Sequence, residues 1–263
     1  MCRLFSLYAN KPVSIDFSFN YAERSILSLS KNNDDGWGVA WYKNGRPALY
    51  KNPLAAFEDN EFSLLAKSIS SSLVISHVRA ATGTPVSYEN THPFKFGNWV
   101  FAHNGQIEEV EKLISRLTTK YRKCIKGQTD SEVYFYWILQ NVEEQGMDKI
   151  CGIKRALSGL INDYKFTSLN FLLADGISLY AFRYDTHSNS YYSLYYLKRD
   201  KDIPWHGCSG ETLQLIGYKN GRNEKAVLVA TERMTSYENW KEIPRGSLAT
   251  INSDLSVVIS SVI

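Results

Sequence analysis

The sequence has few of the residues and patterns that mark several large classes of protein. Its 263 residues include four cysteines, which lie far apart and never in C-x-x-C spacing: Cys2, Cys124, Cys151 and Cys208. This spacing indicates neither a structural zinc site nor a dense disulfide framework. Since no metal-ligand cluster and no phosphate-binding loop stands elsewhere in the sequence, we expect no metal and no cofactor.

Long apolar runs and an excess of one charge are absent as well. No segment is long and apolar enough to act as a signal peptide or to span a bilayer, so the cytoplasm is the expected location. The 30 basic and 27 acidic residues leave a formal net charge of +3, and Lys and Arg are scattered. So weak a charge argues against nucleic acid and against a membrane as partners.

Material for a folded core is plentiful, because 44% of the residues are hydrophobic. No repeat, low-complexity tract or long linker divides the sequence, so we expect one domain over residues 1–263. Runs rich in β-branched and aromatic residues predict strands in the first half at 37–42, 73–78 and 99–102. Helical periodicity predicts helices at 61–69, 107–117 and 130–142. Thr129 and Glu132 predict a capping box at the start of the last helix.

The second half is richer in predicted strands, at 169–174, 178–184, 191–197, 226–230 and 248–251. Hairpins are predicted at Asp175–Gly176 and around Asn220–Gly221. Strands at both ends of the chain, with helices between and around them, indicate sheets covered by helices and an α+β fold.

Cys2 follows Met1 directly and is the most informative residue. Its small side chain permits removal of Met1, which would give Cys2 both a thiol and a free α-amine. An α-amine has a reference pKa of about 7.7–8.0 and a thiol one of about 8.5. The amine can therefore serve as the base for its own nucleophile, as in N-terminal threonine enzymes. Taken alone, a cysteine at position 2 is usually an accident of sequence.

Four further stretches place polar residues at the ends of predicted strands. In Asp34–Gly38 (DDGWG), two glycines beside a tryptophan allow a close approach of the backbone, or simply make a turn with a buried indole. In His77–Gly83 (HVRAATG), Arg79 can hold a carboxylate through two parallel hydrogen bonds, or form a structural ion pair.

The other two stretches carry hydrogen-bond donors and a carboxylate. His92 in Asn90–Phe94 and His103 in Ala102–Gly105 (AHNG) are each as readily core residues as functional ones. Asn104 and Gly105 form either a tight turn or an oxyanion hole made of a side-chain amide and a backbone N–H. Asp130 in TDSE either caps a helix or holds a substrate ammonium. Together these parts match an α-amino acid with a side-chain amide, which is glutamine or a γ-glutamyl compound.

The combination resembles the class II glutamine amidotransferases, N-terminal-nucleophile hydrolases that use cysteine. It is most similar to the small stand-alone members, such as the amidohydrolase subunit of glutathione degradation and the γ-glutamyl hydrolase of ergothioneine synthesis. The segments that carry the resemblance extend to about Gly246: MCRLF, DGWGVAWY, HVRAATG, ENTHPF, NWVFAHNGQI, TDSE and VLVATERMTSYENWKEIPRG. AHNG placed after H-x-R and before T-D-S-E is a specific combination.

The resemblance implies a four-layer αββα sandwich of two mainly antiparallel sheets, the N-terminal-nucleophile hydrolase fold. It implies that Cys2 is the nucleophile and that Asn104 and Gly105 form the oxyanion hole. Arg79 and Thr82 would bind the α-carboxylate of the substrate, and Asp130 its α-amine. His92 would line the pocket and support the carboxylate region.

The implied reaction is hydrolysis of a small γ-glutamyl amide through a γ-glutamyl thioester. Only 17 residues follow Gly246, where the amidase-like segments end, so we expect no synthase domain. Ala80, Ala81 and Gly83 stand where glucosamine-type members carry Trp and His, which favours a larger γ-glutamyl substrate. A non-catalytic or partner-dependent subunit, which binds glutamine or delivers ammonia to a separate synthase, stays open as the alternative. A cysteine protease based on Cys208 is remote, because no matching context surrounds it.

Overall fold

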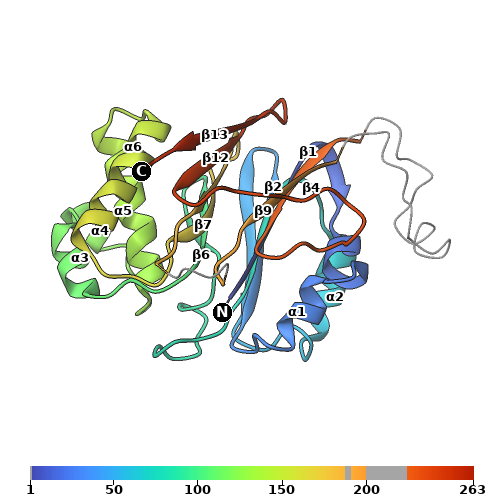
Figure 1. Ribbon diagram of the computed structural model, residues 1–263. Coiled ribbons are helices and arrows are strands. Elements are labelled where there is room, and N and C mark those ends of the chain that lie inside the picture. The colour runs from blue at the N-terminus through green and yellow to red at the C-terminus, as the bar shows by residue number, and fades with distance from the viewer. Residues whose placement is uncertain (1, 187–190, 200–223) are drawn as a thin grey trace.

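The computed structural model describes residues 2–186, 191–199 and 224–263. In this part of the chain two antiparallel sheets pack face to face, and helices cover the outer face of each (Figure 1). The predicted α+β sandwich of four layers is therefore confirmed. Two predicted features, Cys208 as a protease nucleophile and the hairpin at Asn220–Gly221, lie outside the described residues.

The larger sheet is built around β1 (Arg3–Ser14), which pairs with β4 (Ser70–Val78) on one side and β10 (Ala226–Ala230) on the other. The register places Arg3 opposite Val78. The described strands of this sheet follow the order β11 (Lys241–Glu242), β9 (Tyr195–Arg199), β10, β1, β4, β2 (Trp37–Lys43) and β3 (Arg46–Asn52).

The smaller sheet has β6 (Trp99–Asn104) and β7 (Asn170–Ala174) near its centre, and their register places Asn104 opposite Asn170. Its described strands follow the order β13 (Val257–Ser261), β12 (Ser247–Ile251), β8 (Leu179–Arg183), β7, β6 and β5 (Phe94–Phe96). The predicted hairpin joins β7 to β8. There the Asp175 carboxylate accepts the N–H groups of Ile177 and Ser178, each at 2.8 Å, and Gly176 has φ +90°.

Aliphatic side chains fill the space between the two sheets, as stacked sheets with alternating inward residues require. The buried members of this inner layer include Leu4, Ile75, Ala102, Val229 and Ala249. Two outer clusters are richer in aromatic residues and lie between each sheet and its helices.

Two groups of helices cover the outer faces (Figure 1). The first group packs on the larger sheet and comprises a π-helix, η1 (Phe17–Tyr21), with α1 (Ile26–Ser30) and α2 (Asn60–Ser68). The second packs on the smaller sheet and comprises α3 (Val110–Arg116), α4 (Thr119–Arg122), α5 (Asp130–Glu144) and α6 (Lys149–Asp163). None of the helices described is both long and apolar enough to cross a membrane.

Helix α5 is the best predicted helix, and every residue from 131 to 142 is buried. Burial around the whole circumference is expected for a helix enclosed by protein, and the Trp137 indole donates to the Ala156 carbonyl of α6 at 3.0 Å. The predicted capping box is only half formed. Thr129 accepts the Glu132 N–H at 3.3 Å, but the Glu132 carboxylate accepts N–H groups of Lys126 and Gly127 instead.

Several elements differ from the sequence-based expectation. Helix α3 begins at Val110 instead of residue 107, because Glu109 has φ +56° and Ile107 forms a bridge with Phe166. Strand β9 begins at Tyr195 instead of residue 191. Helix α6 was not predicted, although its buried residues show helical spacing: Ile153, Ala156, Leu157 and Leu160.

The Asp59 carboxylate joins three elements of the larger sheet's outer side. It accepts the Trp37 indole N–H at 2.9 Å, the Asn52 amide at 2.8 Å and the Glu61 N–H at the start of α2 at 3.0 Å.

Asp59→Ala leaves a buried indole N–H unpaired and removes a helix cap, so we expect the free energy of unfolding to fall by about 2–3 kcal/mol. Urea denaturation measures it. The exposed neighbour Glu58 is the control: Glu58→Ala should change stability by no more than about 0.5 kcal/mol, and an equal loss would contradict the assignment.

Candidate active site

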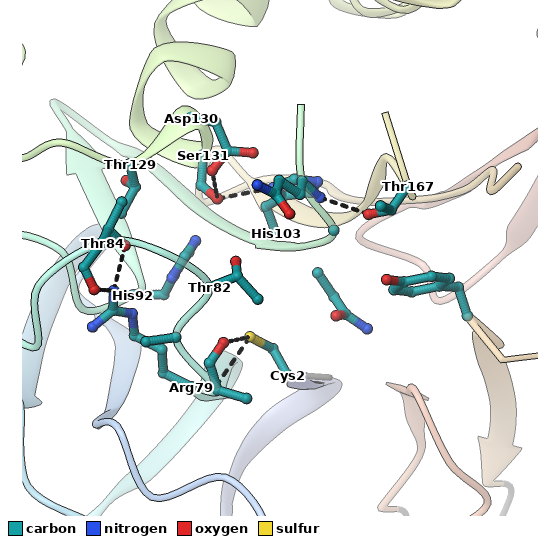
Figure 2. A pocket seen from close by; sticks show the side chains of 16 residues that line it. Cys2, Arg79, Thr82, Thr84, His92, His103, Thr129, Asp130, Ser131 and Thr167 are labelled. Atoms are coloured by element: carbon teal, nitrogen blue, oxygen red, sulfur yellow. Dashed lines mark hydrogen bonds between the residues drawn. The ribbon is translucent and has the colours of Figure 1, made fainter. Parts of the chain in front are cut away.

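The seven residues singled out from the sequence all line one pocket. They come from segments far apart in the chain: Cys2 precedes β1, Arg79 follows β4, Thr82 and His92 lie between β4 and β5, Asn104 ends β6 with Gly105 behind it, and Asp130 opens α5. Figure 2 shows their side chains around a common space. The fold therefore brings together every residue of the predicted site.

Cys2 is half-buried beside the residue that follows Arg79. Its Sγ accepts the Ala80 N–H at 3.3 Å and lies 3.5 Å from the Ala80 carbonyl oxygen (Figure 2). Burial raises the pKa of the Cys2 thiol, while the Ala80 N–H and the charges of Arg79 and Arg3 lower it. The thiol is thus mostly protonated at rest, and it needs a base to become a nucleophile.

Arg79 brings a buried positive charge to the pocket and is 3% exposed. Its guanidinium donates to Thr84 Oγ1 at 2.7 Å and to the Pro85 carbonyl at 3.2 Å. Burial lowers its pKa, and the nearby Cys2 and Asp35 raise it. None of the ion pairs formed by the described residues includes Arg79. The surface ion pair considered from the sequence is therefore not found there. The guanidinium is instead hydrogen-bonded to neighbouring loops, and Arg79 lines the pocket.

The DDGWG stretch supports Arg79 through the backbone. The Arg79 N–H donates to the Gly36 carbonyl at 2.8 Å, and the Asp35 N–H donates to the Arg79 carbonyl at 3.1 Å. The Asp35 carboxylate accepts the Ala81 N–H at 2.7 Å. Three hydrogen bonds thus fix the backbone between Arg79 and Ala81, against which Cys2 lies.

The structure agrees with both interpretations of this stretch, the turn with a buried indole and the close approach of the backbone. Trp37 is a fully buried indole, as the simpler reading expects. Gly38 also allows a close approach, because a Cβ there would overlap the His92 carbonyl oxygen. Since any larger residue at position 38 would displace His92, this glycine positions one wall of the pocket.

Asn104 and Gly105 line the same pocket as Cys2. The Asn104 amide nitrogen is buried and has no hydrogen-bond partner among the described residues. Such a group needs an explanation, because an unpaired buried donor is costly. Gly105 has φ +157°, and a Cβ there would overlap the Ser168 carbonyl oxygen and approach the His103 ring. No other residue type fits at position 105.

His103 lines the pocket beside Ser131, the residue that follows Asp130. Its Nε2 lies 3.0 Å from the Ser168 carbonyl oxygen, which only accepts, so Nε2 carries the proton. Burial lowers the pKa of His103, although Asp130 opposes this, and the ring is neutral. Nδ1 must then accept the proton of the Ser131 hydroxyl at 2.9 Å. Asp130 Oδ2 accepts the Ile107 N–H at 2.7 Å, and Oδ1 lies 3.5 Å from the Ser131 oxygen without receiving its proton, so Oδ1 can still accept a hydrogen bond.

His92 contacts its neighbours through its ring faces and not through its nitrogens. It stacks on His77 at a centroid distance of 4.2 Å and meets the edge of Phe94 at 4.5 Å. In the described part of the chain, the ring nitrogens of His77 and His92 have no hydrogen-bond partner. His92 is therefore both a buried core residue and part of the pocket lining.

Comparison with known proteins decides the family. The model of the class II glutamine amidotransferases matches residues 1–261. The chain belongs to this family. A protein of Methanocaldococcus jannaschii, itself uncharacterized, is 30% identical over 94% of this chain and 68% of its own length. The probable glutamine amidotransferase DUG3 of Saccharomyces cerevisiae is 26% identical over 95% of this chain and 82% of its own length.

Two further comparisons bear on the fold and on the relatives of this amidotransferase. A glutamine aminotransferase class-II domain protein from Silicibacter pomeroyi has the same fold, with a TM-score of 0.64, 23% identity and 99% of each chain covered. The γ-glutamyl-hercynylcysteine sulfoxide hydrolase of Mycobacterium tuberculosis is 35% identical over 77 residues, which is 29% of this chain and 33% of that protein. The amidotransferase is thus an enzyme with the N-terminal-nucleophile hydrolase fold.

Sequence reasoning missed several residues that build the amidotransferase pocket. Ser131 and Thr84 stand next to or within recognised stretches, so those stretches could have indicated them. Gln106, Thr167 and Tyr192 also line the pocket. No local pattern marks Thr167 or Tyr192, because pairing within the fold brings them to the site.

The buried histidines of the amidotransferase should make its stability depend on pH. Burial lowers the pKa of His77 to about 3, and it also lowers the pKa values of His92 and His103. The unfolded chain titrates near 6.5 and then binds more protons than the folded one, so acidification favours unfolding. We expect urea-derived stability to be level from pH 8 to 7. Below about pH 6.5 it should fall by up to about 1.4 kcal/mol per pH unit for each neutral histidine.

Two measurements attribute this effect to the histidines. His77→Asn should make the stability profile shallower below pH 6.5 by one histidine's share. In the folded protein, the ring proton signals of His77 should not titrate between pH 8 and 5, and those of His92 and His103 should titrate at a lower pH than in the unfolded chain. Titration of these signals near pH 6.5 would contradict the assignment.

Proposed function

We propose that the chain hydrolyses a γ-glutamyl amide, either glutamine or a larger γ-glutamyl compound, with Cys2 as the nucleophile. The supporting observation is the convergence in one pocket of a thiol, an unpaired amide donor, a buried arginine and an available carboxylate oxygen. These are the groups that an α-amino acid with a side-chain amide needs. The match of the family model along the chain supports the same chemistry.

The reaction begins once Met1 is removed and the α-amine of Cys2 is free. The amine takes the thiol proton, and Sγ forms a bond with the γ-carbonyl carbon. The resulting oxyanion accepts hydrogen bonds from Asn104 Nδ2 and the Gly105 N–H. As the C–N bond breaks, the α-ammonium returns its proton to the leaving amine. Water then adds to the γ-glutamyl thioester, and glutamate and the free thiol are released.

The glutamyl part is held by charge. Arg79, with Thr82, binds the α-carboxylate, and the guanidinium exchanges part of its contact with the loop at Thr84 for the ligand. Asp130 Oδ1 accepts from the α-ammonium, and the bond from the Ile107 N–H to Oδ2 holds the carboxylate in place. His92 closes the wall next to the carboxylate region without bonding to the ligand through its ring.

The size of the donor follows from the residues after Arg79. Ala80 and Ala81 line the pocket with small side chains, and Gly83 in the same loop carries none. This leaves the side of the pocket next to Arg79 without bulky side chains, which supports a γ-glutamyl compound larger than glutamine as the donor. The partial relationship to a γ-glutamyl hydrolase of Mycobacterium tuberculosis supports hydrolysis of such a compound.

Labelling with a glutamine-mimicking diazoketone tests the nucleophile. Intact mass and peptide mapping should show loss of Met1 and one adduct on Cys2. Cys2→Ala should remove both labelling and hydrolysis, whereas Cys208→Ala should leave both nearly unchanged. A retained N-terminal extension should abolish activity, because it removes the free amine. Full activity with an uncleaved extension would refute the scheme, and a trimmed but unlabelled protein would favour a partner-dependent subunit.

Substitution of Asp130 tests the ammonium contact. Asp130→Asn keeps the shape of the side chain but loses the charge, and a hydrogen bond to a charged group contributes about 1.5–3 kcal/mol. We therefore expect kcat/KM for glutamine to fall by about 10- to 150-fold, mainly through KM. Asp34→Asn, an exposed residue outside the pocket lining, is the matched control and should keep normal kinetics. Normal kinetics in Asp130→Asn would assign Asp130 to helix structure alone.

A further inference from the structure

The pocket continues beyond the residues used so far. Arg79, Thr84 and Thr129 lie at one end of it in Figure 2, Thr167 lies at the opposite end, and Cys2 and Thr82 lie between. Gln106 and Tyr192 line the same pocket. Gln106 and Thr167 are joined by two hydrogen bonds. The Gln106 N–H donates to Thr167 Oγ1 at 3.0 Å, and the Thr167 N–H donates to the Gln106 carbonyl at 2.9 Å.

Tyr192 is fixed to β7, the strand that pairs with the end of β6 at Asn104. Its carbonyl accepts the Asn170 amide at 2.9 Å, and Asn170 is the residue opposite Asn104 in the pairing of β7 with β6. The carbonyl also lies 3.4 Å from Arg183 Nε. The backbone of Tyr192 is thus set on the Asn104 side of the nucleophile, and not on the Arg79 side.

The next residue ties the same segment to the other sheet. The Ser193 hydroxyl donates to the Thr231 carbonyl at 2.8 Å, and the Thr231 N–H donates to the Leu4 carbonyl at 3.2 Å. Leu4 is two residues after Cys2 on β1. Because both sheets hold this segment, the half-buried Tyr192 side chain has a fixed position in the wall of the pocket, beside the reacting bond.

The orientation of the substrate determines what meets this wall. With the α-carboxylate at Arg79, the α-ammonium at Asp130 and the carbonyl oxygen at Asn104, the scissile C–N bond points away from Arg79. The leaving amine therefore faces the end lined by Gln106, Thr167 and Tyr192. None of these three side chains carries a formal charge, and one is aromatic.

We propose that Gln106, Thr167 and Tyr192 form a leaving-group subsite, in which the Tyr192 ring packs against an uncharged aromatic or apolar substituent on the amine. This inference rests on the proposed hydrolysis of γ-glutamyl amides, and it names the class of donor. An aromatic amine gains ring contact with Tyr192, whereas ammonia from glutamine is too small to reach it. Tyr192 is thus a specificity-determining residue for the part of the substrate that departs.

The test compares γ-glutamyl anilide with glutamine in the Met1-free protein. Tyr192→Ala should lower kcat/KM for the anilide by about tenfold, as expected for loss of one aromatic contact. It should leave glutamine within about twofold. Tyr192→Phe keeps the ring and should restore the anilide rate. Two controls remove other tyrosine rings: Tyr191→Ala changes the exposed neighbour that meets Tyr192 edge-on at 5.0 Å, and Tyr21→Ala changes η1.

The outcomes separate this inference from the proposed function. An equal loss for both substrates in Tyr192→Ala, or the same selective loss in Tyr191→Ala, would assign Tyr192 to loop structure and overturn the subsite. Failure of Tyr192→Phe to restore the anilide rate would also overturn the ring contact. If the unaltered protein hydrolyses neither substrate, the proposed function fails first and the subsite with it.

Discussion

The pairing of β1 with β4 is the constraint on which the site depends. Arg3 lies opposite Val78, so the residue before β1 and the residues after β4 leave the sheet side by side. The Cys2 sulfur consequently meets the Ala80 N–H at 3.3 Å. A slip of one residue would turn Leu4 out of the layer between the sheets, since side chains alternate between faces. The apolar packing that fixes the register therefore also places Cys2.

Burying unpaired polar groups at and behind the pocket lowers the stability of the fold. Buried rings of His77 and His92 and the Asn104 amide have no hydrogen-bond partner among the described residues, and unpaired buried groups cost about 1–3 kcal/mol each. Packing in the layers on either side offsets this cost. Exceptions to the rule that buried polar groups are hydrogen-bonded concentrate at functional sites. Here the unpaired donor at Asn104 lines the same pocket as the Cys2 thiol.

Prediction from sequence succeeded where the information is local. The run of apolar residues after TDSE indicates α5, and Asp175–Gly176 indicates a hairpin, because capping, turn chemistry and periodicity act over a few residues. Helix α6 shows the same spacing and was accessible to the same reasoning. The start of β9 was not, because Tyr191 and Tyr192 have strand propensity, yet Asn170 and Thr231 hold the segment Tyr192–Ser193 through long-range hydrogen bonds.

The sequence by itself determined the family, the four-layer fold class and the set of residues Cys2, Arg79, Asn104, Gly105 and Asp130, because short motifs carry those residue types in a specific order. Only the tertiary structure decided which oxygen of Asp130 accepts the Ile107 N–H, that Arg79 bonds to the loop at Thr84, and that Thr167 and Tyr192 reach the pocket. The reason is physical. These contacts depend on loop conformation, strand register and sheet packing, and no local pattern encodes them.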